Sequence, residues 1–448
     1  MSDKKPSRLG RLAELGSLTG RVTAKYVREQ VKQAVSRSEL GRQALDKVQL
    51  ENALDIAETM GRLKGAAMKI GQQAAMFADN LDLPPEVGRV LGKLHAEAQP
   101  VPFDQIREDV EASLEHPLGE LFASVDPEPL GTASLAQAHA ATLPDGREVV
   151  IKVLHRGVEG SVETDLLALR GIMLSSRALA RSRHEIDEIF AELRDRLLEE
   201  LDYLQEAANL ATYARLYGGD PRVRIPTVHT ALSTEKVLVL DRLPGVHIDR
   251  FLETATPEAR QRAGTILAEI YYEQVFQHRT LHCDPHPGNY LFEPDGRVGI
   301  LDFGAVRRFD EHWVAAYASV ALAALADDKE GVLAHAVELG AWDGRKPAAG
   351  DALWAFVRQM VEPFGKGPLR LGGDRENFLD EMKPVIRGVL PYPSITAPRP
   401  LVMLHRSLAG MYALSRRLEA EVDYGALISR NASLAVARAR GALPTDAA

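Results

Sequence analysis

The chain has 448 residues, 45% hydrophobic and 26% charged, a composition typical of a globular protein with two or three core-sized units. Its net charge of −9 excludes a general nucleic-acid-binding protein, because no excess of cations is left to neutralise phosphates. The single cysteine excludes an internal disulfide and fits a reducing compartment.

Residues 1–50 are basic, unlike the chain as a whole. Leucines recur among their Lys and Arg residues at helical spacing, at Leu9, Leu12, Leu15 and Leu18. We expect a basic helical leader with a peripheral contact to an anionic membrane surface; a solvated leader is the alternative. The chain starts without the apolar run of a signal peptide, so we expect a cytoplasmic protein.

A second helical pattern, with few breakers before Leu83-Pro84-Pro85-Glu86, indicates a helical extension over 51–118. Two β-rich units follow, each divided by Pro-Asp-Gly, at 144–146 and 294–296. Pro presets φ, Asp caps the turn and Gly accepts a positive φ, so both units are predicted β-hairpins. We assign the first to an amino-terminal lobe, 119–245, and the second to a helical carboxyl-terminal lobe, 246–440.

The residues between the hairpins predict a long helical region, Glu163 to Tyr217, and an extended segment at 237–245. After Trp313 the pattern is helical throughout. The apolar stretch from Trp313 to Ala326 is too short to span a membrane and predicts a buried helix. We expect no transmembrane segment, including at the carboxyl-terminal RARGALPTDAA.

The loop LHCDPHPGN, residues 281–289, concentrates polar side chains that suit three kinds of site. A zinc site would use His282, Cys283 and His286, but these lack a partner cluster in the sequence, and two prolines stiffen the loop. A cysteine nucleophile would need a histidine and an orienting group near Cys283, which the sequence leaves open.

The third interpretation is the catalytic loop of a phosphotransferase. Asp284 and Asn289 form D-x-x-x-x-N, His282 stands two positions before the Asp, and Asp302-Phe303-Gly304 follows at the end of the second hairpin. Phosphoryl transfer needs a carboxylate at the nucleophile and hard oxygen ligands for Mg²⁺. We therefore predict Asp284 as the catalytic base and Asn289 and Asp302 as metal ligands.

A cation for the ATP phosphates is predicted at Lys152, in the strand VVIKV. A lysine among β-branched residues needs a partner for its ammonium group, unless it lies on an edge strand and faces water. The following helix offers Glu199, Asp202 and Glu206 on one face, although a solvated acidic face is the ordinary interpretation of such a pattern.

Five motifs in this order resemble the UbiB/AarF family of atypical kinases, from about Asp55 to Leu408. They are Lys69-Ile70-Gly71-Gln72, similar to the family's K-x-G-Q; the Ala-rich segment from Pro129 to His139; the helix ELDYLQEAAN; HCDPHPGN; and LDFG.

The resemblance implies a role for each matched position. Glu206 should pair with Lys152. Glu200 and Asp202 match an E-x-D that faces Lys69 and Gln72, which implies a regulatory contact above the active site. The phosphate loop should be Gly131, Thr132, Ala133 and Ser134, although the commonest family pattern has alanines at its first two positions.

We therefore predict an α+β, two-lobed protein-kinase-like fold with a helical N-terminal extension over the active-site cleft. The resemblance implies ATP or ADP and Mg²⁺ as cofactors, an atypical kinase or ATPase, and a role in ubiquinone or isoprenoid-lipid metabolism, with a lipid or quinone precursor as a possible ligand. The alternative is a nucleotide-binding regulatory or chaperone-like protein without a phosphoacceptor. A protein kinase is a third option, but there is no A-P-E motif, and helical sequence resumes soon after Gly304.

Overall fold

The computed structural model describes residues 100–133, 135–158, 201–371 and 378–443, together with isolated positions between 162 and 198. The chain divides into two compact units. Residues up to Ala208 and the segment Val228–Arg242 form the first unit; Asn209–Thr227 and the residues from Leu243 onward form the second. Residues 209–227 thus belong with the second unit, although the predicted boundary at 245 placed them in the first.

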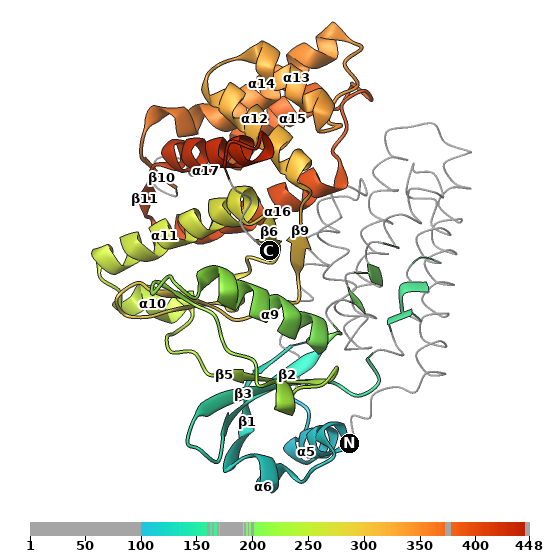
Figure 1. Ribbon diagram of the computed structural model, residues 1–448, viewed down its shortest axis with the longest axis vertical. Coiled ribbons are helices and arrows are strands. Elements are labelled where there is room, and N and C mark those ends of the chain that lie inside the picture. The colour runs from blue at the N-terminus through green and yellow to red at the C-terminus, as the bar shows by residue number, and fades with distance from the viewer. Residues whose placement is uncertain are drawn as a thin grey trace, which may run out of the picture. The chain divides into compact units, whose positions relative to one another are not determined.

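The first unit is built on an antiparallel sheet of four strands in the order β1-β2-β3-β5. Its elements are α5 (Phe103–Leu114), α6 (Leu118–Leu121), β1 (Ser124–Thr132), β2 (Ala136–Thr142), β3 (Glu148–Leu154), the 3₁₀ turn η2 (Thr230–Leu232) and β5 (Val237–Asp241). Helix α5 lies against this sheet (Figure 1).

The core of the first unit follows from the two-residue period of β3. Val149, Ile151 and Val153 are buried and pack with Ile106 and Val110 of α5, so these strand positions form the helix-facing side. The intervening Lys152 therefore lies on the opposite side of the sheet. Helix α5 thus shares a core with the sheet, whereas the sequence grouped its residues with the helical extension.

Both predicted Pro-Asp-Gly hairpins are confirmed, one between β2 and β3 and one between β7 (Tyr290–Phe292) and β8 (Val298–Ile300). Gly146 and Gly296 each have φ of 87°, which favours glycine. In both turns the Asp carboxylate accepts the backbone N–H two residues on. At Gly296 a Cβ atom would also lie 2.4 Å from the Ala259 carbonyl oxygen, so no other residue fits.

Helix α9 (Tyr203–Tyr217) begins in the first unit and ends within the sequence of the second. The second unit is mainly helical, with small sheets β4-β8-β7, β6-β9 and β10-β11. Its early elements are β4 (Val223–Arg224), α10 (Ile248–Thr254), α11 (Pro257–Tyr272), the π-helical turn η3 (Glu273–Gln277), β6 (Thr280–His282), the 3₁₀ turn η4 (Pro287–Asn289), β7, β8 and β9 (Val306–Arg308).

The later elements of the second unit are α12 (Glu311–Leu325), α13 (Lys329–Glu338), α14 (Pro347–Val361), the 3₁₀ turn η5 (Glu362–Lys366), β10 (Leu369–Arg370), α15 (Phe378–Val389), α16 (Arg399–Leu418), β11 (Glu421–Val422) and α17 (Tyr424–Ala439). Figure 1 shows α12 and α17 packed side by side, and α11 beside α16.

The predicted helix at Trp313 to Ala326 is α12, whose amino terminus is capped by Asp310: its carboxylate accepts the N–H groups of His312 and Trp313. Val314 and Ala318 on this helix are buried. None of the helices that the structure describes is both long enough and apolar enough to cross a membrane.

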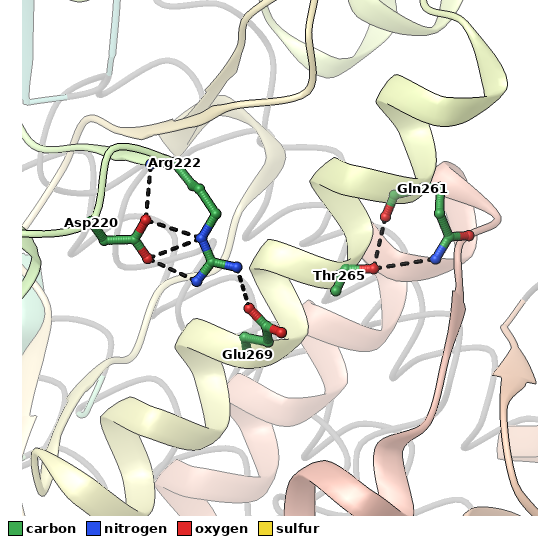
Figure 2. Close-up of polar contacts among 5 residues, drawn as sticks. All are labelled: Asp220, Arg222, Gln261, Thr265 and Glu269. Atoms are coloured by element: carbon green, nitrogen blue, oxygen red, sulfur yellow. Dashed lines mark hydrogen bonds and ion pairs between the residues drawn. The ribbon is translucent and has the colours of Figure 1, made fainter.

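Helix α11 holds two other segments of the second unit in place. Figure 2 shows the Arg222 guanidinium between the carboxylates of Asp220 and Glu269. The nitrogen–oxygen distances of these two ion pairs are 2.8 and 2.6 Å. Earlier on the helix, the Gln261 Nε2 donates to the Thr265 hydroxyl (Figure 2). The same side chain donates to the Glu421 carbonyl in β11 and accepts the Glu421 N–H. These contacts attach the segment before β4 and strand β11 to the same helix.

Candidate functional site

Lys152 contacts its predicted partner, Glu206. The Lys152 Nζ lies 2.7 Å from the Glu206 Oε1, and their side chains are only 18% and 5% exposed. Lys152 comes from the middle of β3 and Glu206 from the first turn of α9. A buried charge without a partner would be costly in free energy. The pairing with Glu206 therefore keeps the Lys152 ammonium group at a fixed point of the sheet.

The phosphate-loop candidates lie at the turn between β1 and β2. Gly131 pairs with Ala138, and Ala138 pairs in turn with Lys152, so the three residues form one row across the sheet. The Ala133 N–H donates to the Ala136 carbonyl at 2.8 Å and closes the turn. Gly131 does not have a positive φ, and a Cβ there would meet open space, so its backbone does not require glycine.

Asp202 differs from its predicted place on a helix face. It lies in the turn before α9, where its Oδ1 accepts the N–H groups of Leu204 and Gln205, both at 3.0 Å. An aspartate at this position caps the unpaired donors of the first turn, which interrupts the helix predicted from 163 to 217. Glu206 therefore begins a new helix.

In the second unit, Asp284 and Asn289 are brought together in the loop after β6. The Asn289 Nδ2 donates to both the Asp284 Oδ2 at 3.0 Å and the Asp284 carbonyl at 2.9 Å. Proline and glycine shape the 3₁₀ turn between them, where the Asn289 N–H donates to the His286 carbonyl. With the amide nitrogen committed, the Asn289 amide oxygen is the group that can face a cation.

Asp302 lies at the same end of the β7–β8 hairpin as Asn289. Tyr290 pairs with Ile300, and the Leu301 N–H donates to the Asn289 carbonyl at 2.9 Å, so the residues flanking the hairpin are adjacent. The Asp302 Oδ1 accepts the Gly304 N–H at 3.0 Å, which orients the carboxylate. An amide oxygen and a carboxylate suit Mg²⁺, and the donor set fits the predicted metal.

The backbone around Asp302 is fixed by β6 and its loop. The His282 Nε2 hydrogen-bonds the Asp302 carbonyl oxygen, and the Cys283 N–H donates to the Ala305 carbonyl at 2.8 Å. Phe303 is fully buried, with the His282 ring 5.4 Å away in an edge-on arrangement. The two loops that carry Asp284 and Asp302 are thus joined by backbone and ring contacts.

A family model, the ABC1 atypical kinase-like domain, matches residues 93–336, more than half of the chain. The chain belongs to the ABC1 atypical kinase-like family. This confirms the resemblance, the α+β protein-kinase-like fold and the enzyme class, an atypical kinase.

Members of the family are similar to the chain over most of its length. The mitochondrial atypical kinase COQ8B of Rattus norvegicus is 29% identical over 93% of this chain and 79% of its own. The probable protein kinase UbiB of Marinobacter nauticus is 29% identical over 81% and 67%. A solved complex of Rv3197 with erythromycin, from Mycobacterium tuberculosis, has a TM-score of 0.61 and 28% identity over 88% of this chain and 97% of that one.

Three residues that support the site of this ABC1 family member were missed in the sequence. The Asn209 Nδ2 donates to the Phe303 carbonyl at 2.9 Å, and the Tyr213 ring lies 4.6 Å from the Phe303 ring. The Gln274 Oε1, from the π-helical turn, accepts the His282 N–H at 2.9 Å. A signal existed for Asn209, because it follows Glu206 by three positions and shares its helix face.

The histidines and the cysteine of the loop make separate contacts instead of converging. The Cys283 thiol donates to the Leu281 carbonyl at 3.4 Å, and the His286 Nδ1 accepts the Gly288 N–H at 3.1 Å. Within the described ranges, no group of three His, Cys, Asp or Glu side chains is placed to hold a metal ion.

Five predicted positions lie outside the described residues: Lys69, Gln72, Ser134, Glu199 and Glu200. The helical extension and the basic leader lie outside them as well.

Proposed function

We propose that this protein binds ATP with Mg²⁺. It then either transfers the γ-phosphoryl group to a small-molecule or lipid acceptor or hydrolyses the ATP. The observation that carries the proposal is that each unit holds one part of the required chemistry. The first unit supplies a cation, Lys152, oriented by Glu206. The second supplies a carboxylate, Asp284, beside the two oxygen donors of Asn289 and Asp302.

We propose a role for each of these residues, in keeping with the local geometry. Lys152 would neutralise the α- and β-phosphates, and the segment from Gly131 to Ser134 would serve as the phosphate loop. Asn289 and Asp302 would hold Mg²⁺, which would supply charge compensation for the phosphates. Asp284 accepts the proton of the attacking hydroxyl, and the Asn289 amide fixes its orientation from 3.0 Å.

A small or lipid acceptor fits the segment that follows Asp302 better than a peptide does. Strand β9 pairs with β6 directly after Gly304, and α12 begins at Glu311. This leaves no long activation segment on which a peptide could dock. We propose ubiquinone or another isoprenoid lipid pathway as the setting, supported by the similarity to COQ8 and UbiB atypical kinases.

Asp302→Asn tests nucleotide binding. The variant should keep its fold and lose the Mg²⁺-dependent rise in unfolding temperature that MgATP or MgADP gives the wild type, since binding only to the folded state stabilises it. Asp249→Asn removes the same charge from an exposed position of the second unit and should keep the full rise. An unchanged shift in Asp302→Asn would remove this residue from metal binding.

Asp284→Asn separates chemistry from binding. It should bind MgATP as the wild type does and lower turnover by about 10²–10⁴-fold, the usual contribution of a general base. Unchanged turnover would reject Asp284 as the base. If the wild type binds MgATP but yields no phosphorylated product and no ADP, the protein is a nucleotide-binding regulator instead. Lipid and metabolite profiles of a strain carrying Asp302→Asn identify the pathway.

We also propose that the helical extension regulates this site through Lys69 and Gln72. Lys69 would pair with Glu200 or Asp202 and hold the extension in place. Since the Asp202 Oδ1 already caps α9, Glu200 is the better candidate of the two. Lys69→Ala should then increase hydrogen exchange in 51–100 and change nucleotide affinity. Wild-type exchange and affinity together would reject the contact.

A further inference from the structure

A cavity of about 650 Å³ opens in the second unit, and none of the proposed catalytic or metal-binding residues lines it. Its walls come from the end of α9, the residues between the π-helical turn and β6, the segment from β9 to α12, and the face of α17. The volume lies in the range of sites for small organic ligands.

The cavity is lined by more cations than anions. Its charged side chains, apart from His278, are Arg215, Arg279, Arg308, Arg438, Asp310 and Glu311. Four arginines against two carboxylates leave a formal excess of two positive charges.

Both carboxylates already have partners. Glu311 forms an ion pair with Arg279, and the Asp310 carboxylate accepts two backbone N–H groups as the cap of α12. By contrast, Arg215 and Arg308 are exposed and form no ion pair with any residue that the structure describes. The fourth arginine, Arg438, donates to the Gln277 carbonyl at 3.1 Å. Arg215 and Arg308 are therefore the two exposed cations that the cavity offers to a ligand.

Backbone geometry places Arg279, the residue before β6, close to Arg308 at the end of β9. Arg279 has φ of 52°, a left-handed conformation that a non-glycine residue adopts at a cost. It is held there by the Phe309 N–H, which donates to the Arg279 carbonyl at 2.8 Å, and by the pairing of Thr280 with Arg308. Strained positions that the surroundings enforce are commonest at binding sites.

The wall also has apolar side chains, among them Leu216, Phe276, Phe309 and Val314, beside the polar Thr212, Gln277 and Thr280. We propose that this cavity is a second ligand site, separate from the nucleotide site, and that it binds a phosphate monoester. Arg215 and Arg308 bind the phosphate oxygens, and the apolar residues contact the organic part. A phosphate fits better than a carboxylate because its three oxygens can satisfy more than one guanidinium group.

Titration calorimetry with phenyl phosphate at low salt tests the site. The wild type should bind, and Arg215→Gln/Arg308→Gln should weaken binding by at least about tenfold, as the loss of a charge-assisted hydrogen bond predicts. Arg250→Gln, an exposed arginine on α10 outside the cavity, is the matched control and should bind as the wild type does. Equal affinity in the double variant, or no binding by the wild type at millimolar concentration, would overturn the proposal.

Asp302→Asn distinguishes this site from the nucleotide site. Phenyl phosphate should still bind this variant, whereas loss of binding would place the probe with the nucleotide and overturn the second site. The source of the phosphate is decided by competition. Vesicles of phosphatidylcholine with phosphatidic acid that displace phenyl phosphate assign the site to a lipid headgroup; displacement by soluble monoesters alone assigns it to a free metabolite.

Discussion

At the scale of single residues, Lys152 forms a mostly buried ion pair with Glu206, and the proposed function also gives it a chemical role. Its ammonium group is mostly buried beside Glu206, so removing either side chain takes away from the other an opposite charge that lies 2.7 Å away. The free-energy cost of each single substitution therefore includes the penalty for burying the charge that remains.

Lys152→Met and Glu206→Gln should each weaken MgADP binding by about tenfold or more, and the double variant should lose less than the sum of both losses. The two side chains should show a coupling free energy of about 1–3 kcal/mol. Binding isotherms of the four proteins give this value. Lys236→Met, an exposed lysine of the same unit, should leave affinity unchanged. Strict additivity would mean that the pair does not act together on the nucleotide.

His405 on α16 should make stability depend on pH. Burial lowers the pKa of His405 from its ordinary 6.5 to about 4, and its Nε2 lies 3.4 Å from the Tyr317 hydroxyl. Between these two values the unfolded chain binds a proton that the folded protein does not, so stability falls as the pH falls from 6.5 to 4.

The contribution from His405 is at most about 3 kcal/mol, given the size of the pKa shift. His405→Gln cannot titrate, so the difference in unfolding free energy between it and the wild type should change across this window. Denaturant unfolding at pH 7.5, 5.5 and 4.5 measures the difference. A constant difference would show that His405 titrates alike in both states.

At the scale of elements, the hairpins were predictable because their turns are determined by local chemistry. The turns at Asp145-Gly146 and Asp295-Gly296 need only a capping carboxylate and a residue with a positive φ. A stretch of four residues is enough to predict both. The strand around Lys152 was predictable for a similar reason, since alternating burial follows its β-branched residues.

The start of α9 and the π-helical turn were not predicted. Asp202 and Gln205 form the D-x-x-Q arrangement of a capped helix start, but the apolar period on either side continues without a break and favoured one long helix. The turn at Glu273–Gln277 depends on tertiary contacts, in which Gln274 reaches the backbone of His282. Local sequence holds no signal for such a contact.

The Arg222 contacts in Figure 2 should stabilise the second unit measurably. The hydrogen bonds from Arg222 lower the pKa of Asp220. Arg222 also compensates the negative charge of Glu269. Burial, and then the charge of Glu269, raise the pKa of the nearby Glu273. Arg222→Gln should lower the free energy of unfolding at pH 7 by about 1 kcal/mol, near the upper end for a partly exposed ion pair.

Arg250→Gln breaks a more exposed pair with Glu253 and should cost less than about 0.5 kcal/mol. Asp220 stabilises the fold only while it is ionised, so the effect of Arg222→Gln should shrink as the pH falls below the ordinary Asp value of 3.8. Denaturant unfolding at pH 7 and pH 3.5 compares the three proteins. Equal costs for Arg222→Gln and Arg250→Gln would show that the network adds nothing.

At the scale of the whole molecule, charge is unevenly distributed along the chain. The net charge is −9, yet residues 1–50 are basic. An anionic membrane surface should therefore attract the leader and repel the remainder, which would favour one orientation on the membrane.

Deleting residues 1–30 should reduce flotation with liposomes that contain anionic lipids, and 0.5 M salt should have the same effect on the full chain, because screening shortens the range of the attraction. The deleted protein should lose its dependence on salt. Binding that is independent of salt and survives the deletion would place the membrane contact elsewhere.

The two Asp-Gly turns also determine how the protein ages chemically. An aspartate before glycine rearranges to isoaspartate when the glycine nitrogen attacks the side-chain carboxyl group, and a flexible chain allows this attack. In the folded protein the Gly146 N–H donates to the Leu143 carbonyl, and hydrogen bonds from Arg147 hold the Asp145 carboxylate in the turn and lower its pKa. The Gly296 N–H is bonded in the same way to the Glu293 carbonyl. Isoaspartate at Asp145 or Asp295 would therefore be a permanent chemical mark of time spent unfolded.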